Sequence, residues 1–208
     1  MVLVSGPREP GRREQNKADK LRRIRTAARE LFYSRGFSSV TTQEVADLAE
    51  VGTGTLFRYA HSKGELLCMV ANEEFTAIVE SVPDTGDPVE DLLVLCDPFI
   101  AGLRRQPENV VAYHRETLFG ELGPHRAEAL RILREVRRIV GVILARRTGH
   151  GQDDPALGAP ARTVFDVLYM EIVRSGVDAD PRRDHRAELR GHVDRVLHGV
   201  LPTLSGLR

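Results

Sequence analysis

The spacing of apolar residues limits the possible folds of this chain more than any other feature. Near its start, Leu21, Ile24 and Ala28 recur three and four positions apart, which places them on one face of a helix. The same period continues along the chain, and no segment alternates apolar and polar residues as a half-buried strand does. The sequence therefore predicts an all-α fold, with helices at about residues 16–35, 41–49, 53–60, 62–80, 88–105, 107–120, 124–147, 160–176 and 181–204.

Residues 41–66, TTQEVADLAEVGTGTLFRYAHSKGEL, indicate two short helices on either side of a tight turn, with a further helix beginning after Ser62. Thr41 followed by Glu44 is a capping box, in which each side chain bonds the backbone N–H of the other residue. The helix expected over residues 53–60 keeps Leu56 inward and exposes small and polar residues. Helix, turn and short helix, braced by a preceding helix, is the arrangement that places a second helix in the major groove of DNA.

A helix in the major groove needs donors that reach base edges, and residues 53–60 supply them. Arg58 can donate two hydrogen bonds to O6 and N7 of guanine, and Gly54 lets the backbone come close. Thr53 and Thr55 can bond bases or phosphates. Phosphate contacts are expected at the margins of this surface, from Thr42, Tyr59 and Lys63. The alternative is that residues 55–60 form an ordinary short helix and that Lys63 is a solvated cation.

The charge distribution favours the same end of the chain. The formal net charge of the whole chain is zero, but residues 1–66 carry 12 Lys/Arg against 8 Asp/Glu, and residues 8–29 carry nine against three. Such asymmetry suggests a polyanionic partner for the front of the chain. A solvated helix face is the alternative explanation. The sequence thus predicts a disordered basic arm over residues 1–15, a DNA-binding domain over 16–66 and a second helical domain over 67–208.

Residues 20–67 resemble the DNA-binding domain of the tetracycline-repressor (TetR) family of bacterial transcriptional regulators, through the run RTAARELFYSRGFSSVTTQEVADLAEVGTGTLFRYAHSKGELL. The resemblance implies a ligand-responsive regulator, usually a repressor, that binds a palindromic operator as a homodimer and is released by a small-molecule inducer. It also implies base contacts from Thr53, Gly54 and Arg58, phosphate contacts from Thr42, Tyr59 and Lys63, and a core that includes Leu56 and Phe32.

Three residues depart from the pattern of that family. Phe57 stands where a phosphate-bonding tyrosine is usual, so we expect only apolar contact with sugar or methyl groups there. Glu50 occupies a turn position that is usually Gly or Ala, which puts an acid near the groove. Ala60 replaces a bulkier residue, which predicts looser packing or a neighbour that fills the space.

Two apolar stripes near the end of the chain predict a dimer interface. The resemblance implies a C-terminal domain that binds the inducer and forms a two-fold dimer. The last two long helices each carry apolar residues at i, i+3, i+4 and i+7, as a four-helix interface between two copies requires. Packing within one chain is the alternative for both stripes. The predicted interface residues are Val164, Leu168, Ile172, Val193, Val196, Leu197 and Val200.

Polar and aromatic residues on otherwise apolar helical faces are the candidates for an inducer pocket, because such pockets are mostly apolar with a few placed polar groups. Pro98 lies inside an expected helix, where it should bend the helix and free a backbone carbonyl. Core packing is the alternative for each candidate. The candidates are Cys96, Phe99, Tyr113, His114, Phe119, Phe165, Tyr169 and Met170.

Other functions find less support in the sequence. Cys68 and Cys96 lack CxxC spacing and are expected to be buried rather than paired or metal-bound. There is no HExxH, no G-x-S-x-G and no phosphate loop, which predicts no catalytic site, metal or cofactor. No signal peptide and no apolar run long enough for a membrane span occur, so we expect a cytoplasmic protein. An all-α enzyme or small-molecule-binding protein without sequence-specific DNA binding stays open, and the zero net charge argues against a non-specific DNA binder.

Overall fold

The computed structural model describes residues 11–178, 180 and 182–205, without the side chains of residues 200 and 202–205. Over these residues the regular structure is helical with no strand, which confirms the predicted all-α fold. None of these helices has the length and apolar character needed to cross a lipid bilayer. The helices are α1 (Arg12–Arg35), α2 (Thr42–Leu48), α3 (Thr53–Leu56), α4 (Lys63–Val79), α5 (Pro88–Arg105), α6 (Pro107–Phe119), α7 (Pro124–Thr148), α8 (Gly158–Val177) and α9 (His185–Ser205), with a 3-10 turn η1 (Pro155–Leu157) before α8.

The first helix begins earlier than its apolar pattern does. α1 starts at Arg12, so the predicted disordered arm is wrong for residues 12–15, and residues 1–10 lie outside the described part. Arg, Glu and Gln form helices well even without an apolar face, which is why periodicity gave no signal there. The helix ends at Arg35, the predicted last residue, and Gly36 follows with φ +80°, a conformation that other residues rarely take.

The capping box at the start of α2 is confirmed. The Glu44 N–H donates to Thr41 Oγ1 at 3.2 Å, and the Thr41 N–H donates to the Glu44 carboxylate at 2.8 Å. Hydrogen bonds from Arg35 and Thr41 lower the pKa of Glu44 to about 2. α3 is shorter than predicted, because the N–H groups of Tyr59 and Ala60 both bond the Leu56 carbonyl and tighten residues 57–60 into turns.

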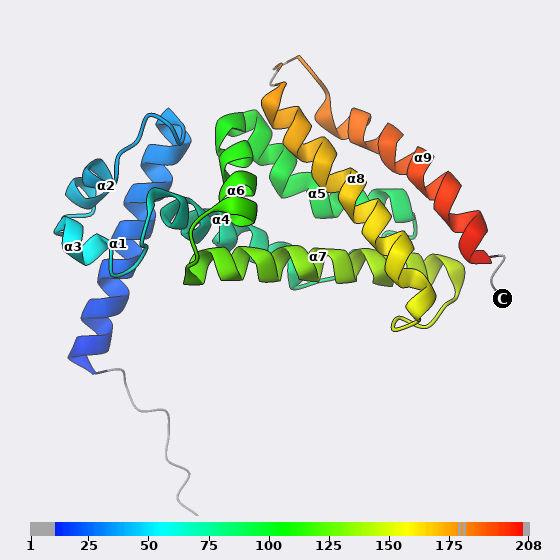
Figure 1. The fold of residues 1–208 in the computed structure, drawn as a ribbon, viewed down its shortest axis with the longest axis horizontal. Helices are drawn as coiled ribbons and strands as arrows, with labels where there is room; N and C mark the ends of the chain where they lie inside the picture. The colour runs from blue at the N-terminus through cyan, green and yellow to red at the C-terminus, as the bar shows by residue number, and fades with distance from the viewer. Residues whose placement is uncertain (1–10, 179, 181, 206–208) are drawn as a thin grey trace, which may run out of the picture.

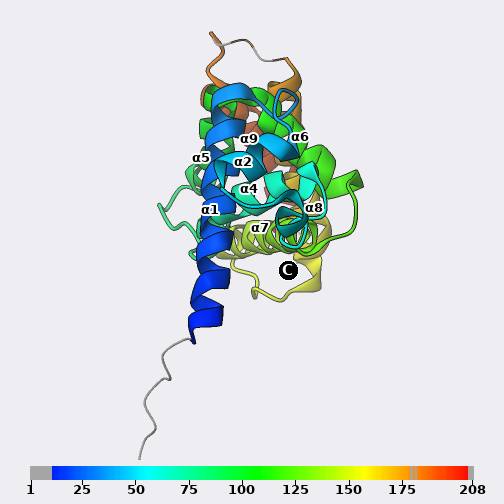
Figure 2. The same cartoon turned by 90° about the vertical axis from the view of Figure 1, so that its left-hand side faces the viewer.

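The helices form two parts joined by α4. In Figure 1, α1, α2 and α3 lie together at one end of the molecule, and α5 to α9 form the larger part. α4 packs against α1 on one side and against α7 on the other, so it belongs to both parts. Figure 2 views the molecule from the end where α1 to α3 lie, with α1 in front of the larger part.

The two C-terminal stripes are core of a single chain, which corrects the predicted dimer residues. Val164 and Leu168 on α8 are 1% and 5% exposed, and Val193 on α9 is 1% exposed. Ile172 and Leu197 are equally buried, and Val196 packs partly buried against the same core. Neighbouring helices of the same chain cover the five buried side chains, whereas Val196 keeps part of its surface exposed. The side chain of Val200 lies outside the described part.

Candidate nucleic-acid interface and buried aromatic cluster

The exposed face of α3 has the predicted composition. Leu56 is fully buried and anchors the helix, whereas Arg58 is exposed and bonds no described residue. Gly54 is exposed, and a Cβ built on it would meet no atom within 4 Å. Phe57 is 38% exposed beside them. A free guanidinium next to bare backbone is the combination that base readout in the major groove uses.

Thr53 is held by a residue that sequence reasoning missed. Its Oγ1 donates to Gln43 Oε1 at 2.8 Å, and Gln43 Nε2 donates to Asp47 at 2.7 Å. Gln43 follows Thr42 on the exposed side of α2. The spacing of apolar residues gives no signal for the role of an exposed polar side chain. Thr55 is half-buried on α3, and Thr42 is half-buried at the start of α2. Their predicted contacts with DNA stay predictions.

Tyr59 is fixed at both ends. Its hydroxyl donates to the Lys17 carbonyl on α1 at 3.2 Å, and its own carbonyl lies 2.9 Å from His125 Nε2 at the start of α7. Ala60, next along the chain, is fully buried, so neighbours fill the space that its small side chain leaves. The end of α3 is therefore set by contacts with both parts of the molecule.

Lys63 has a structural role that its predicted phosphate contact did not anticipate. Its ammonium donates to the carbonyls of Phe37 and Val40 at 2.9 and 3.0 Å, with Ser38 O at 3.5 Å. It also lies 4.4 Å from the centroid of the Phe37 ring. An ammonium carries three donors, and all three are engaged here. The phosphate assignment is therefore corrected: in this conformation Lys63 fastens the α1–α2 connection.

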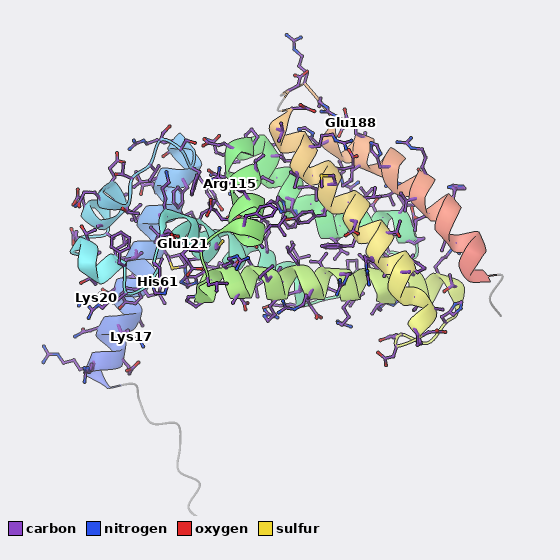
Figure 3. The ribbon with its side chains drawn as sticks, in the orientation of Figure 1. Lys17, Lys20, His61, Arg115, Glu121 and Glu188 are labelled. Atoms are coloured by element: carbon purple, nitrogen blue, oxygen red, sulfur yellow. The ribbon has the colours of Figure 1, made fainter. Side chains whose placement is uncertain are left out.

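Two other lysines offer the free charge that Lys63 does not. Lys17 and Lys20 project from the amino-terminal half of α1, where it extends past α3, and His61 lies in the same region (Figure 3). Within the described residues neither ammonium forms a hydrogen bond or ion pair. Free cations at the margin of a recognition helix suit sequence-independent contact with phosphates.

Glu50 occupies the turn between α2 and α3 with φ +51°, the left-handed region. Its carboxylate is exposed and accepts a hydrogen bond from Arg23 at 3.3 Å. A side chain in this region costs roughly 1–2 kcal/mol. The turn thus demands a conformation that glycine adopts freely and that Glu50 adopts at a cost in stability.

We predict that Glu50→Gly raises the free energy of unfolding by about 1 kcal/mol, because it relieves this backbone strain. Urea denaturation followed by circular dichroism measures the change. Glu50→Gln is the matched control, since it removes the charge but keeps the strained backbone. Equal stabilisation by both variants would show that the charge of Glu50, rather than its backbone conformation, destabilises the wild type.

Six rings form a continuous cluster between α4, α5, α6 and α8, in which Phe165 and Tyr169 are half-buried and the other four are buried. Phe75 and Phe99 stack with centroids 4.0 Å apart, and Phe75 meets Tyr113 at 5.0 Å. His114 lies 5.6 Å from Phe99 and 4.5 Å from Tyr169. Phe165 continues the cluster, with its centroid 5.7 Å from that of Tyr169. The structure thus brings together five of the predicted pocket residues and adds Phe75, which was not among the candidates.

Polar atoms without partners lie inside this cluster. His114 is 2% exposed, and neither of its ring nitrogens has a hydrogen-bond partner. The Tyr169 hydroxyl is also buried and unpartnered. Burial lowers the pKa of His114 to about 3 and raises that of Tyr169 to about 12, so both side chains are neutral at physiological pH. Unsatisfied polar groups in a core are costly, typically 1–3 kcal/mol each, and call for a functional explanation.

The remaining pocket candidates lie elsewhere. Phe119 is 81% exposed at the end of α6 and Met170 is 51% exposed on α8, so neither lines a buried pocket. Their helical positions fall on faces that no other helix of this chain covers. Cys96 is buried on α5, where burial raises the pKa of its thiol to about 12. Cys96 and Cys68 are both free thiols, and no group of three His, Cys, Asp or Glu in the described ranges could hold a metal.

A cavity of about 30 Å³ adjoins the cluster. Phe75 and Tyr113 form part of its wall, and Pro98 and Gly102 contribute the bend of α5. Arg105, paired with Glu74 at 3.4 Å, lies at its polar side. Pockets for drug-sized ligands measure roughly 300–1,000 Å³. The space present is enough for water but smaller than such a pocket, and we call this arrangement of the rings closed.

Known proteins resemble this chain in sequence. The profile of the tetR family of bacterial regulatory proteins matches residues 24–68. The HTH-type transcriptional repressor KstR of Mycobacterium tuberculosis is 26% identical over 176 residues, which cover 83% of this chain and 77% of that protein. The matched region therefore extends well beyond the helix-turn-helix.

Solved structures resemble it in fold. FadR of Thermus thermophilus, a TetR family transcriptional repressor in complex with lauroyl-CoA, matches with a TM-score of 0.66 and 29% identity over 87% of this chain and 95% of that one. A TetR transcriptional regulator from Rhodococcus sp. RHA1 matches with a TM-score of 0.65 and 21% identity, over 88% of this chain and 97% of that one. The second likeness concerns the fold alone.

Proposed function

Because this chain belongs to the tetR family of bacterial regulatory proteins, we propose that it is a transcriptional repressor whose DNA binding responds to a small-molecule effector. One observation carries the DNA-binding part: α3 is anchored by buried Leu56 and presents an unpaired Arg58 beside exposed Gly54. Arg58 would read a guanine, with Thr53 and Phe57 contacting adjacent groups. Lys17 and Lys20 would supply phosphate contacts in place of Lys63.

The proposed repressor acts as a homodimer through the outer face of α8 rather than through its buried stripe. Met170 and Val177 are 51% and 67% exposed on that face, and α9 packs beside α8. Large exposed apolar side chains on neighbouring turns of one helix favour contact with a second copy. A two-fold dimer would place two α3 helices on half-sites about 34–36 Å apart, which requires a palindromic operator.

We predict that Met170→Glu weakens dimerisation at least about tenfold, because it buries a charge at the proposed contact. Sedimentation velocity across a concentration series measures the monomer–dimer equilibrium. Met170→Leu is the control and should leave the equilibrium near that of the wild type. A Met170→Glu protein that dimerises normally would place the interface elsewhere.

For the effector, we propose a fatty acyl thioester. The lauroyl-CoA complex of the Thermus thermophilus relative supports this class, and so does the aromatic cluster, which offers an apolar wall for an acyl chain. His114 and Tyr169 would bond an uncharged group such as the thioester carbonyl. A carboxylate would fit poorly, because both residues are neutral and no cation is among the rings.

The closed cavity suggests how the effector acts. An acyl chain can enter only if the rings separate, so the effector binds a different conformation from the one described here. A ligand shifts an equilibrium only by its preference for one state. If the closed state is the one that binds the operator, the effector releases DNA by stabilising the open state.

The test has two steps. Selection from a random duplex library at physiological ionic strength should enrich a palindrome. Lauroyl-CoA should then release the protein from that duplex in a fluorescence anisotropy titration, whereas CoA alone and lauric acid should not. Failure to enrich any sequence would refute the DNA-binding proposal. Enrichment without release by lauroyl-CoA would refute the effector class and leave the repressor proposal standing.

A further inference from the structure

Three hydrogen bonds connect the aromatic cluster to the end of α3. The Tyr113 hydroxyl on α6 donates to Asn72 Oδ1 on α4 at 3.0 Å, and Asn72 Nδ2 donates to the His125 carbonyl at 2.8 Å. His125 Nε2, on α7, lies 2.9 Å from the Tyr59 carbonyl, to which it donates. Tyr113 and Asn72 are 1% and 5% exposed, so water does not compete for their bonds.

The middle of this series is firmly held. The Glu65 carboxylate on α4 accepts hydrogen bonds from the N–H groups of His125 at 3.3 Å and Arg126 at 2.7 Å. Gly123 lies so close to this carboxylate that a Cβ there would come within 2.3 Å of it. The Arg126 side chain in turn bonds the carbonyls of Thr117 and Leu118 at the end of α6. Glu65 and Arg126 thus tie the start of α7 to α4 and α6, so that a movement of α4 or α6 reaches His125.

We propose that Tyr113, Asn72 and His125 are positioning residues that transmit the state of the aromatic cluster to α3. This inference rests on the proposed effector response. Tyr113 contacts Phe75 and His114, so separation of the rings displaces its hydroxyl. Asn72 and His125 then lose their partners in turn, and the Tyr59 carbonyl is released. The Tyr59 N–H bonds the Leu56 carbonyl and so closes the turn that follows α3. Since Arg58 lies within that turn, its orientation changes with Tyr59.

A second link between the two parts provides a matched control. Asn109 on α6 is 6% exposed, and its Nδ2 donates to the Phe32 carbonyl on α1 at 2.8 Å. Nearby, the Glu108 carboxylate accepts a hydrogen bond from the Ser38 N–H at 2.7 Å. These bonds reach α1 and the α1–α2 connection, not α3. Asn109→Leu therefore removes a buried amide–carbonyl bond of the same kind outside the proposed relay.

Hydrogen exchange tests the relay without any effector. In the full-length protein, mass spectrometry would follow a peptide spanning residues 53–61. Tyr113→Phe, Asn72→Leu and His125→Leu should each speed exchange there about fivefold, the effect of one lost hydrogen bond. Asn109→Leu should not, although it loses a comparable bond. His125→Gln keeps a donor and should restore protection. If only His125→Leu changes this peptide, the contact is local and the relay is refuted.

Operator release by lauroyl-CoA gives the second readout. In the wild type, we expect operator affinity to fall about 5- to 150-fold at saturating lauroyl-CoA. Asn72→Leu should cut that factor at least about fivefold. Glu108→Ala, which removes the bond to Ser38 and alters no residue of the cavity wall, should leave it unchanged. An intact factor in Asn72→Leu would refute the relay while the proposed effector stands. A wild type that lauroyl-CoA does not release would refute the proposed effector, and exchange at residues 53–61 would still decide whether the relay exists.

Discussion

Arg58→Ala is expected to abolish the preference of the protein for one base pair in each half-site, with a loss of about 1–3 kcal/mol of discrimination. The Arg58 side chain is exposed, bonds no described residue and lies in the turn that follows buried Leu56, the last residue of α3. The variant should therefore fold normally and still bind DNA through phosphates. Competition titrations between the selected operator and single-base substitutions of it measure the discrimination directly.

Lys17→Ala is the matched control for that result. Its side chain is equally free, but it lies on α1 at the margin of the surface. We expect it to weaken binding to all sequences alike and to reduce the slope of log affinity against log salt by about one. If Arg58→Ala and Lys17→Ala gave the same pattern, the assignment of base and phosphate contacts would be wrong.

His114→Leu is expected to make the free energy of unfolding less sensitive to acid, by about 2 kcal/mol between pH 7 and pH 5. The pKa of His114 is about 3 in the folded protein because the ring is buried, against 6.5 as its ordinary value. Below pH 6.5 the unfolded chain therefore takes up a proton that the folded protein excludes. Stability from the neutral ring is full above pH 6.5 and is lost as the pH falls toward 3.

Urea denaturation at pH 7 and at pH 5 measures this difference. Tyr169→Phe serves as the control, because it alters the same ring cluster but retains the histidine and should keep the wild-type pH dependence. At pH 7 we expect the leucine variant to be at least as stable as the wild type, since it removes two unpartnered ring nitrogens. A wild type and leucine variant with parallel pH profiles would place the imidazole in contact with water.

Local signals in the sequence predicted the DNA-binding part well. The capping box of Thr41 and Glu44, the end of the first helix at residue 35 and the inward Leu56 are each set by residues close in the chain, and the structure has all three. The roles of Lys63 and Gln43 were not predictable in this way. Lys63 bonds carbonyls more than twenty positions earlier in the chain, and no periodicity reports such a contact.

The larger part, α5 to α9, shows more clearly which contacts sequence patterns do not predict. Apolar spacing correctly placed Val164, Leu168 and Val193 on the apolar faces of their helices. Spacing does not identify which helix packs against such a face. Aromatic character selected five members of the ring cluster because large rings pack together wherever a core permits it. Phe119 and Met170 have the same character, but their faces point outward. Asn72 and His125 carried no signal, since their partners come from different helices.

The small cavity beside the rings sets the concentration at which the protein could respond to an effector. A ligand that binds only a minor conformation has its apparent affinity reduced by the fraction of molecules in that conformation. The stacking of Phe75 on Phe99 thus acts as a threshold: the more tightly the rings close, the more effector is needed. Changes in ring packing would therefore tune the sensitivity of such a sensor through the population of the open conformation, and not only through contacts with the ligand.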